Sequence, residues 1–103
     1  MDRKQLAIDF AKTLNHPEIE KIILYGSVAR DEDSKDSDID ILIIVSNVDD
    51  DLKIEDDIYE KTFDTLLKTG ESLSVQMVDN EHYKKYSHFS FYKNVKKDGV
   101  LIG

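Results

Sequence analysis

The stretch DSDIDILIIV, residues 36–45, contains the longest apolar run of the 103-residue chain, Ile41 to Val45. A run that is apolar on both faces is typical of a buried central strand, so we expect a strand over residues 39–46. Asp38 and Asp40 stand at the mouth of this strand. Because side chains alternate along a strand, both carboxylates should point to the same face of the sheet.

Helix and strand patterns follow one another on both sides of the central strand. The expected elements are helices at 2–15, 51–69, about 80–86 and 90–98, strands at 20–25, 39–46 and 72–79, a turn at 47–51 and a short further strand at 100–102. Pro17 marks the end of the first helix, and Gly70 caps the longest one. Three strands with helices packed on them predict a small two-layer α/β (α+β) fold. The chain length suits one domain over residues 1–103.

The two carboxylates are candidate metal ligands. Two carboxylates this close repel each other unless a cation lies between them. Mg²⁺ takes oxygen ligands and is commonly held by one or two carboxylates together with substrate phosphates. Asp38 and Asp40 are therefore also the candidate catalytic residues. The pattern is not an EF-hand, because the sixth position from Asp36 is Ile41 and the twelfth is Asn47. A lone Asp-x-Asp also occurs on solvated acidic surfaces, so the pair needs support from its surroundings.

A glycine–serine corner provides that support. Gly26 and Ser27 follow the strand over 20–25, and glycine lets a backbone approach a phosphate closely. Ser27 would start a short helix whose N–H groups and hydroxyl bind phosphate oxygens. Arg30 lies one helical turn further, where it either faces a triphosphate or pairs with nearby carboxylates. Gly26, Ser27 and Arg30 are thus the candidate nucleotide- and phosphate-binding residues.

The spacing Gly-Ser-x10-Asp-x-Asp resembles that of the polymerase β-type nucleotidyltransferase superfamily. Nearly the whole chain is similar to the minimal nucleotidyltransferases, including the closing pattern from Phe91 to Val100. The resemblance implies a mixed sheet with the active site at the ends of its strands. It implies that Asp38 and Asp40 hold two Mg²⁺ ions and that Gly26 and Ser27 contact the phosphates. A hydroxyl would then attack the α-phosphorus of a nucleoside triphosphate, most commonly ATP, and pyrophosphate would leave.

The chain departs from the pattern of this superfamily at two places. Active members carry a third carboxylate on the third strand, where this chain has Ser74 and Gln76 at the outward polar positions. Gln76 is the candidate contributor from that strand, through its amide oxygen. Asp79, on the opposite parity, serves either the site or the N-terminal cap of the next helix. Asp31 stands where members often have a glycine after the arginine of the Gly-Ser helix.

The composition excludes several other classes of protein. The net charge of −8 argues against a broad nucleic-acid-binding face, because nonspecific binding depends on Lys and Arg. The absence of cysteine excludes a disulfide scaffold and a thiolate metal site. With no signal-peptide pattern and no membrane-length apolar run, we expect a cytoplasmic location. The C-terminal lysines form either a solvated helix face or a docking face for an acidic partner or phosphate; they are Lys84, Lys85, Lys93, Lys96 and Lys97.

Two functions compete on these observations. The resemblance implies an enzyme that transfers AMP from ATP to a tyrosine of a HEPN-domain ribonuclease, acting as its antitoxin. The missing third carboxylate motivates the alternative, a catalytically weak or inactive module that neutralises its partner by contact. An enzyme that modifies a small molecule such as an aminoglycoside would need a further domain to form the acceptor site. The sequence leaves open whether the chain forms a homo- or a hetero-oligomer.

Overall fold

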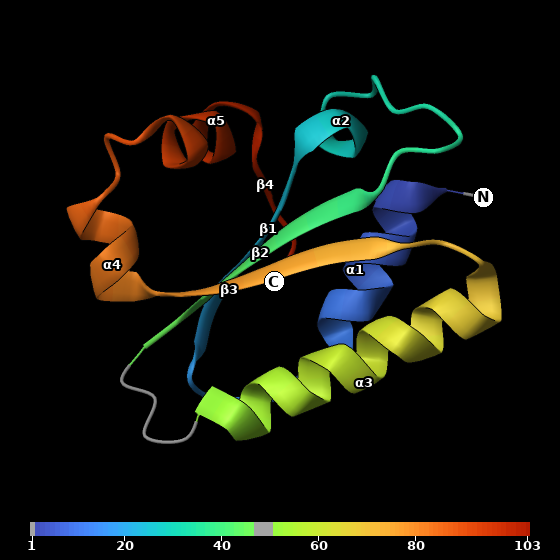
Figure 1. The fold of residues 1–103 in the computed structure, drawn as a ribbon, viewed down its shortest axis with the longest axis horizontal. Coiled ribbons are helices and arrows are strands. Elements are labelled where there is room, and N and C mark those ends of the chain that lie inside the picture. The colour runs from blue at the N-terminus through green and yellow to red at the C-terminus, as the bar shows by residue number, and fades with distance from the viewer. Residues whose placement is uncertain (1, 47–50) are drawn as a thin grey trace.

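The computed structural model describes residues 2–46 and 51–103, which form a four-stranded sheet flanked by helices (Figure 1). The strands are β1 (Ile19–Tyr25), β2 (Ile39–Val45), β3 (Leu73–Asp79) and β4 (Val100–Leu101). The helices are α1 (Arg3–Lys12), α2 (Gly26–Ala29), α3 (Asp51–Thr69), α4 (Asn80–Lys85) and α5 (Ser90–Asp98). The expected order of elements is confirmed. Of the turn predicted over residues 47–51, residues 47–50 lie outside the described part of the chain, and Asp51 is the first residue of α3.

The sheet has the strand order β3-β2-β1-β4. β2 pairs parallel with β3 and antiparallel with β1, and β1 pairs antiparallel with β4. The parallel pair forms because α3 provides the long crossover that two adjacent parallel strands need. The mixed sheet implied by the resemblance is therefore confirmed. The short strand expected at 100–102 supplies its fourth member, β4.

Alternation along β2 assigns its side chains to two faces. One set packs in a core shared with α1 and α3, and its members are Ile39, Ile41, Ile43 and Val45. The other set packs against Tyr92 and Val95 of α5, and its members are Leu42 and Ile44. Figure 1 shows α3 on one side of the sheet and α4 with α5 on the other. The predicted two layers correspond to the sheet and to the helices α1 and α3 packed on one of its faces. Helices α4 and α5 cover part of the second face. Asp40 points to that second face, because it alternates with Ile39 and Ile41.

Local hydrogen bonds determine where the helices end. α1 ends at Lys12, before the predicted end at residue 15, and the Thr13 hydroxyl donates back to the Phe10 carbonyl at 2.6 Å. Gly70 follows α3 with φ +74°, and its N–H donates to the Leu66 carbonyl at 2.8 Å. The cap predicted at Gly70 is therefore confirmed, because a left-handed residue at this position favours glycine.

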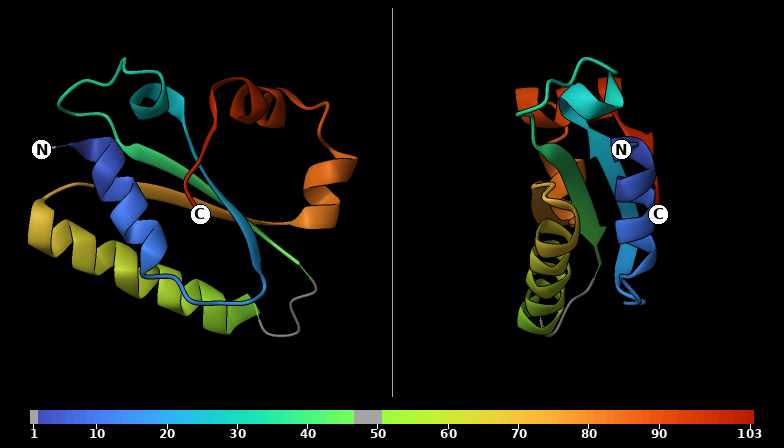
Figure 2. Two further views of the ribbon diagram at one scale, coloured as in Figure 1. Left: turned by 180° about the vertical axis from the view of Figure 1, so that it is seen from behind. Right: turned by 90° about the vertical axis from the view of Figure 1, so that its right-hand side faces the viewer.

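The arrangement of the helices leaves the two ends of the sheet in different surroundings. In the view from behind, α1 and α3 lie on the same side of the strands, while α2 and α5 lie side by side (Figure 2). The start of β2 therefore lies next to α2, which in turn contacts α5. Across the part of the chain that the structure describes, no helix has the length and apolar character needed to cross a membrane.

Candidate active site

The chain turns sharply at Gly26, between the end of β1 and the first turn of α2. Gly26 has φ +77°, a left-handed conformation that costs a residue with a side chain about 1–2 kcal/mol. A Cβ atom at this position would lie 2.3 Å from Oδ2 of Asp40. The Asp40 carboxylate therefore packs directly against the backbone of the turn, and only glycine leaves room for it.

Asp38 and Asp40 meet the glycine turn at one corner of the sheet. Tyr25, the last residue of β1, pairs with Asp40 in the antiparallel register, so the turn lies next to the start of β2. Burial raises the pKa of Asp40 above its ordinary value, and the negative charge of Asp38 raises it further. The charge effect shows that the two carboxylates lie near each other, as strand alternation predicts. We call Gly26, Asp38 and Asp40 the carboxylate corner.

An aromatic surface borders the carboxylate corner. Burial, with a smaller contribution from the charge of Asp40, raises the pKa of Tyr25 to about 12. The Tyr25 ring meets Phe91 of α5 edge-on, with 5.6 Å between the ring centroids and an angle of 87° between the planes. Phe91 is 37% exposed. Tyr25 therefore connects Asp40, its partner in the sheet, to an accessible aromatic ring on α5.

Arg30 pairs with carboxylates, which is one of the two roles predicted for it. Its Nε lies 3.0 Å from Oε2 of Glu32, and its Nη1 lies 3.1 Å from Oδ2 of Asp98 at the end of α5. The Arg30 charge also reaches the corner, because it lowers the pKa of Asp40 against the two larger effects that raise it. Since Arg30 is exposed, it can exchange these carboxylates for phosphate oxygens without disturbing the core.

The register of β3 places Ser74 beside the corner. Asp40 pairs with Ser74, and Leu42 pairs with Gln76, so Gln76 lies one same-face position further along. Gln76 is exposed, and Ser74 is half-buried. The two polar residues of β3 therefore do lie on the face of Asp40, with the serine nearer to it.

Among the residues that the structure describes, no third acidic side chain joins Asp38 and Asp40. Asp79 caps α4, because its Oδ1 accepts a hydrogen bond from the Glu81 N–H at 2.8 Å. Of the two roles predicted for Asp79, capping is the one observed. Within the described ranges, no three His, Asp, Glu or Cys side chains form a cluster that could hold a metal ion by themselves. The corner offers a cation two carboxylates and neutral oxygens.

Arg3 of α1 holds the loop that leads into Asp38, a role that the sequence analysis missed. Its guanidinium donates to Oε2 of Glu71 at 2.7 and 2.9 Å and to Oδ2 of Asp33 at 3.1 Å. It also donates to two backbone carbonyls of the same loop, those of Ser34 and Ser37. Only 12% of the Arg3 side chain is exposed. One side chain thus ties the loop before β2 to Glu71, two residues before β3, and so helps to position the corner.

Arg3→Gln is expected to lower the free energy of unfolding by about 2 kcal/mol, because partly buried hydrogen bonds to charged groups are lost together. Urea unfolding measures the change. Lys4→Gln is the matched control, since Lys4 forms an exposed ion pair with Asp31 at 2.9 Å whose loss should cost less than about 1 kcal/mol. Equal losses in the two variants would show that Arg3 contributes no more than a surface charge.

Asp31 adopts the backbone conformation that a glycine would favour at this position. It has φ +59°, and aspartate tolerates the left-handed region better than most residues with a side chain. The Glu32 N–H donates to the Ser27 carbonyl at 2.9 Å and the Asp31 N–H donates to the Val28 carbonyl at 3.2 Å, so α2 ends in a Schellman motif. The departure from the superfamily pattern at Asp31 is therefore accommodated by a left-handed residue at the end of α2.

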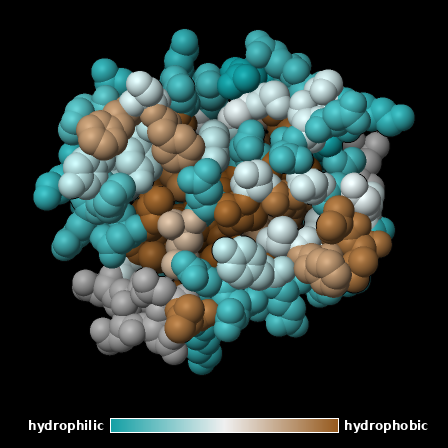
Figure 3. Space-filling view, in the orientation of Figure 1, coloured by the Kyte–Doolittle hydropathy of each residue, from teal (hydrophilic) through white to brown (hydrophobic). Residues whose placement is uncertain are grey.

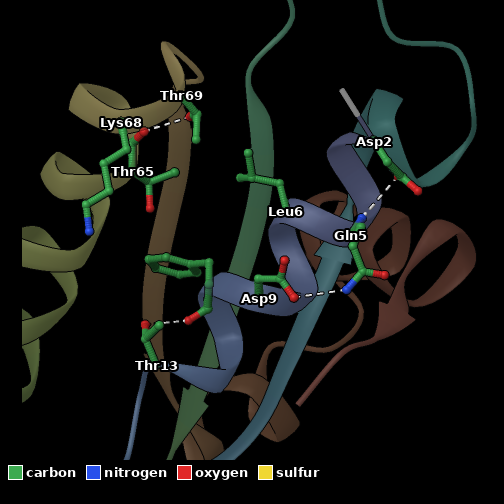
Figure 4. A pocket seen from close by; sticks show the side chains of 9 residues that line it. Asp2, Gln5, Leu6, Asp9, Thr13, Thr65, Lys68 and Thr69 are labelled. Atoms are coloured by element: carbon green, nitrogen blue, oxygen red, sulfur yellow. Dashed lines mark hydrogen bonds between the residues drawn. The ribbon is translucent and has the colours of Figure 1, made fainter.

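A groove of about 450 Å³ between α1 and α3 lies away from the corner (Figure 4). Its apolar lining includes Leu6 and Phe10. The polar side chains on its α1 wall bond to their own helix: Asp2 accepts from the Gln5 N–H, and the Gln5 amide donates to Asp9. Since α1 and α3 cover the sheet face opposite Asp40, this groove is separate from the carboxylate corner.

The basic and aromatic residues of α4 and α5 pack against one another. His82 Nδ1 lies 3.0 Å from the Tyr92 hydroxyl, and its ring lies 4.5 Å from that of Tyr86. Two of the C-terminal lysines lie over tyrosine rings at 5.5 and 5.6 Å from the centroids, and they are Lys85 and Lys96. These contacts hold α4 and α5 together and so stabilise α5, whose Phe91 borders the carboxylate corner.

Comparison with known proteins finds relatives of this chain. A family model described as "Polymerase beta, Nucleotidyltransferase" matches residues 8–102. A protein of Methanocaldococcus jannaschii, named as a candidate protein adenylyltransferase, is 40% identical to this chain over 84 residues. The match covers 82% of this chain and 78% of that protein.

Solved structures share the fold. A chain from a crystal structure of a toxin–antitoxin with AMP-PNP superimposes with a TM-score of 0.58 at 18% identity, covering 99% of this chain and 72% of that chain. A chain from the complex of a tri-AMPylated HEPN toxin of Shewanella oneidensis with its MNT antitoxin superimposes with a TM-score of 0.55 at 19% identity. That match covers 100% of this chain and 72% of the other. At these identities the likeness establishes the fold alone.

Proposed function

We propose a function from one premise: this chain belongs to the polymerase beta nucleotidyltransferase family and is a nucleotidyltransferase. In the proposal it transfers AMP from ATP to a hydroxyl group of a protein, with the carboxylate corner as its active site. The relative from Methanocaldococcus jannaschii, named as a candidate protein adenylyltransferase, supports a protein acceptor.

One observation carries the assignment of the site. Oδ2 of Asp40 would lie 2.3 Å from a Cβ at Gly26, so the carboxylate and the bare backbone of the turn occupy the same corner. The Asp38 charge acts on that carboxylate as well. A nucleotidyltransferase needs acidic oxygens for a cation and a close backbone approach for phosphates at one place, and this corner supplies both.

The donor set at the corner fits Mg²⁺. Asp38 and Asp40 offer only oxygen ligands. Burial and, second to it, repulsion by Asp38 raise the pKa of Asp40, and a cation between the carboxylates would relieve that repulsion. These two residues would hold the ion. When bound, Mg²⁺ supplies positive charge to the phosphate oxygens and to the attacking hydroxyl.

The remaining residues of the corner position the substrate. In the proposal the Gly26 turn and Ser27 contact the phosphates, and Arg30 moves from Glu32 and Asp98 onto the triphosphate. The acceptor oxygen forms a bond to the α-phosphorus as the hydroxyl gives its proton to water. The bond from that phosphorus to the bridging oxygen breaks, and pyrophosphate leaves with the electron pair. The contribution of the protein is then mainly orientation and electrostatic stabilisation.

For the acceptor we propose a tyrosine of a HEPN-domain partner, with this chain as its antitoxin. The support is the shared fold with chains from toxin–antitoxin structures, one of which contains a tri-AMPylated HEPN toxin. The aromatic border formed by Tyr25 and Phe91 suits a tyrosine ring that enters the corner.

The test is label transfer with the chain and a co-purified HEPN-domain partner. α-Labelled ATP with Mg²⁺ is expected to label a tyrosine of the partner, and chelation of Mg²⁺ is expected to stop the reaction. γ-Labelled ATP is the control, because its label leaves with pyrophosphate. Label from the γ position on the partner would replace the proposal with phosphoryl transfer, and no label from either position would remove the activity.

The second candidate function is neutralisation of the partner by contact. The observation that favours it is the pairing of Asp40 with Ser74, a neutral residue, on β3. A contact inhibitor keeps its affinity for the partner without ATP and Mg²⁺, and its Asp38→Asn variant still neutralises the partner. Calorimetry together with a toxicity assay separates this function from adenylyl transfer.

A further inference from the structure

α3 exposes a row of large apolar side chains on its outer side. Tyr59, Phe63 and Leu66 are 68%, 59% and 42% exposed and follow one another at helical spacing, so they lie on one face. Leu52, 70% exposed, stands one heptad before Tyr59 on the same face. Figure 3 shows a group of apolar side chains over the right-hand end of α3 and a smaller apolar area at its left-hand end. We call these four residues the α3 row.

An acidic row lies beside the α3 row. Asp56, Glu60 and Asp64 are all exposed and are spaced four residues apart, so they line up along the helix. Lys61 pairs with Asp57, one helical turn earlier, at 3.1 Å, and the charges of Glu60 and Asp64 contribute less to raising its pKa than this pair does. The solvent edge of the α3 row is therefore acidic.

This pattern specifies the shape and charge of a partner. Scattered exposed apolar residues are normal, whereas apolar residues at i+3/i+4 spacing, with one more a heptad earlier, match the apolar face of another helix. The acidic edge favours a helix with lysine or arginine beside its apolar face. A second copy of this chain is disfavoured, because antiparallel pairing about a twofold axis would set acidic row against acidic row.

We infer that α3 is a docking surface for an amphipathic helix of a partner protein, apolar on one face and bordered by basic residues. α3 covers the sheet face opposite Asp40, so a partner docked there leaves the carboxylate corner open. The inference does not rest on the proposed function, because docking requires neither nucleotide nor metal.

Two synthetic helical peptides test the inference by fluorescence anisotropy, without ATP or Mg²⁺. Both carry leucine at heptad positions along one face, and they differ only in the bordering residues, which are lysine in one and glutamate in the other. The lysine peptide is expected to bind at least tenfold more tightly than the glutamate peptide. Phe63→Ser is expected to weaken binding of the lysine peptide at least tenfold, while Leu101→Ser, which changes an equally exposed leucine on β4, leaves it unchanged.

Charge reversal and the oligomeric state complete the test. The double variant Glu60→Lys, Asp64→Lys is expected to reverse the preference between the two peptides. Failure of both peptides to bind, equal binding of the two, or equal effects of Phe63→Ser and Leu101→Ser would overturn the inference. A dimer in sedimentation that Phe63→Ser converts to a monomer would also overturn it, because the row would then be occupied by a second copy.

Discussion

Gly26→Ala is expected to lose about 2–3 kcal/mol of folding free energy and most of the transferase activity. The left-handed φ of +77° alone costs a residue with a side chain about 1–2 kcal/mol. The new methyl group would also overlap Oδ2 of Asp40, so either the turn or the carboxylate must move. The stability loss is measured by urea unfolding, and the activity loss by label transfer from α-labelled ATP.

Gly70→Ala separates the two causes. Gly70 has nearly the same φ, +74°, but a Cβ there meets no atom within 4 Å. This variant should therefore lose only the conformational part, about 1–2 kcal/mol, and keep its activity. If Gly26→Ala kept full activity, the close approach of the turn to Asp40 would have no part in the reaction, and the assignment of the corner would fail.

The sequence predicted the corner because its signals are local. The apolar run at 41–45 identifies a buried strand wherever it lies in the sheet, and alternation then places Asp38 and Asp40 together. Glycine at the end of the preceding strand is equally local, because a left-handed turn favours that residue whatever it contacts. The element order and the mixed sheet followed from such patterns together with the resemblance.

The contacts of the two arginines could not be predicted in the same way. Arg3 bonds to Glu71, which is 68 positions away, and Arg30 bonds to Asp98 at the same separation. Neither pairing leaves a periodic signal in the sequence, because a charged residue at a helix end looks the same whether it is solvated or buried against a loop. Only the packing of α1 on the loop before β2 identifies Arg3 as a positioning residue.

The residue of β3 that lies nearest to Asp40 depends on the strand register. The sequence alone left two polar residues, Ser74 and Gln76, as candidates for that position. Ser74 and Gln76 share a face by alternation, and a shift of two residues along the strand would exchange them. The length of α3 and the Gly70 cap determine where β3 begins, and they place Ser74 opposite Asp40. The sequence predicts which residues of β3 lie on the same sheet face as Asp40. Which of them pairs with Asp40 depends on the crossover through α3.

Asp38→Asn and Asp40→Asn are each expected to reduce nucleotidyl transfer about a thousandfold or more. Each change removes a carboxylate from the candidate cation site, and a catalytic metal contributes several kcal/mol to stabilisation of the transition state. Asp36→Asn is the matched control, because it removes the same charge from an exposed residue of the preceding loop. Transfer that survived in the double variant Asp38→Asn, Asp40→Asn would place the reaction elsewhere.

Asp40→Asn is expected to lose transferase activity but to gain stability. A gain in stability would show that the activity is not lost through unfolding. Burial and the nearby Asp38 charge raise the pKa of Asp40, so its ionised form destabilises the folded state at neutral pH. Asp40→Asn removes that charge and is expected to raise the melting temperature by a few degrees, since like charges side by side cost up to about 1 kcal/mol. Asp36→Asn should leave the melting temperature nearly unchanged.

The pH dependence fixes the sign of this effect. A raised folded-state pKa means that the penalty is present once Asp40 is ionised and disappears as the pH falls through that pKa and Asp40 takes up a proton. The gap in melting temperature between Asp40→Asn and the unmodified chain should therefore be largest near neutral pH and close in acid. Mg²⁺ at neutral pH should close it too, by stabilising only the chain that keeps both carboxylates. A gap that is insensitive to both pH and Mg²⁺ would mean that the two acids do not face a common cation, and the corner would lose its role in binding one.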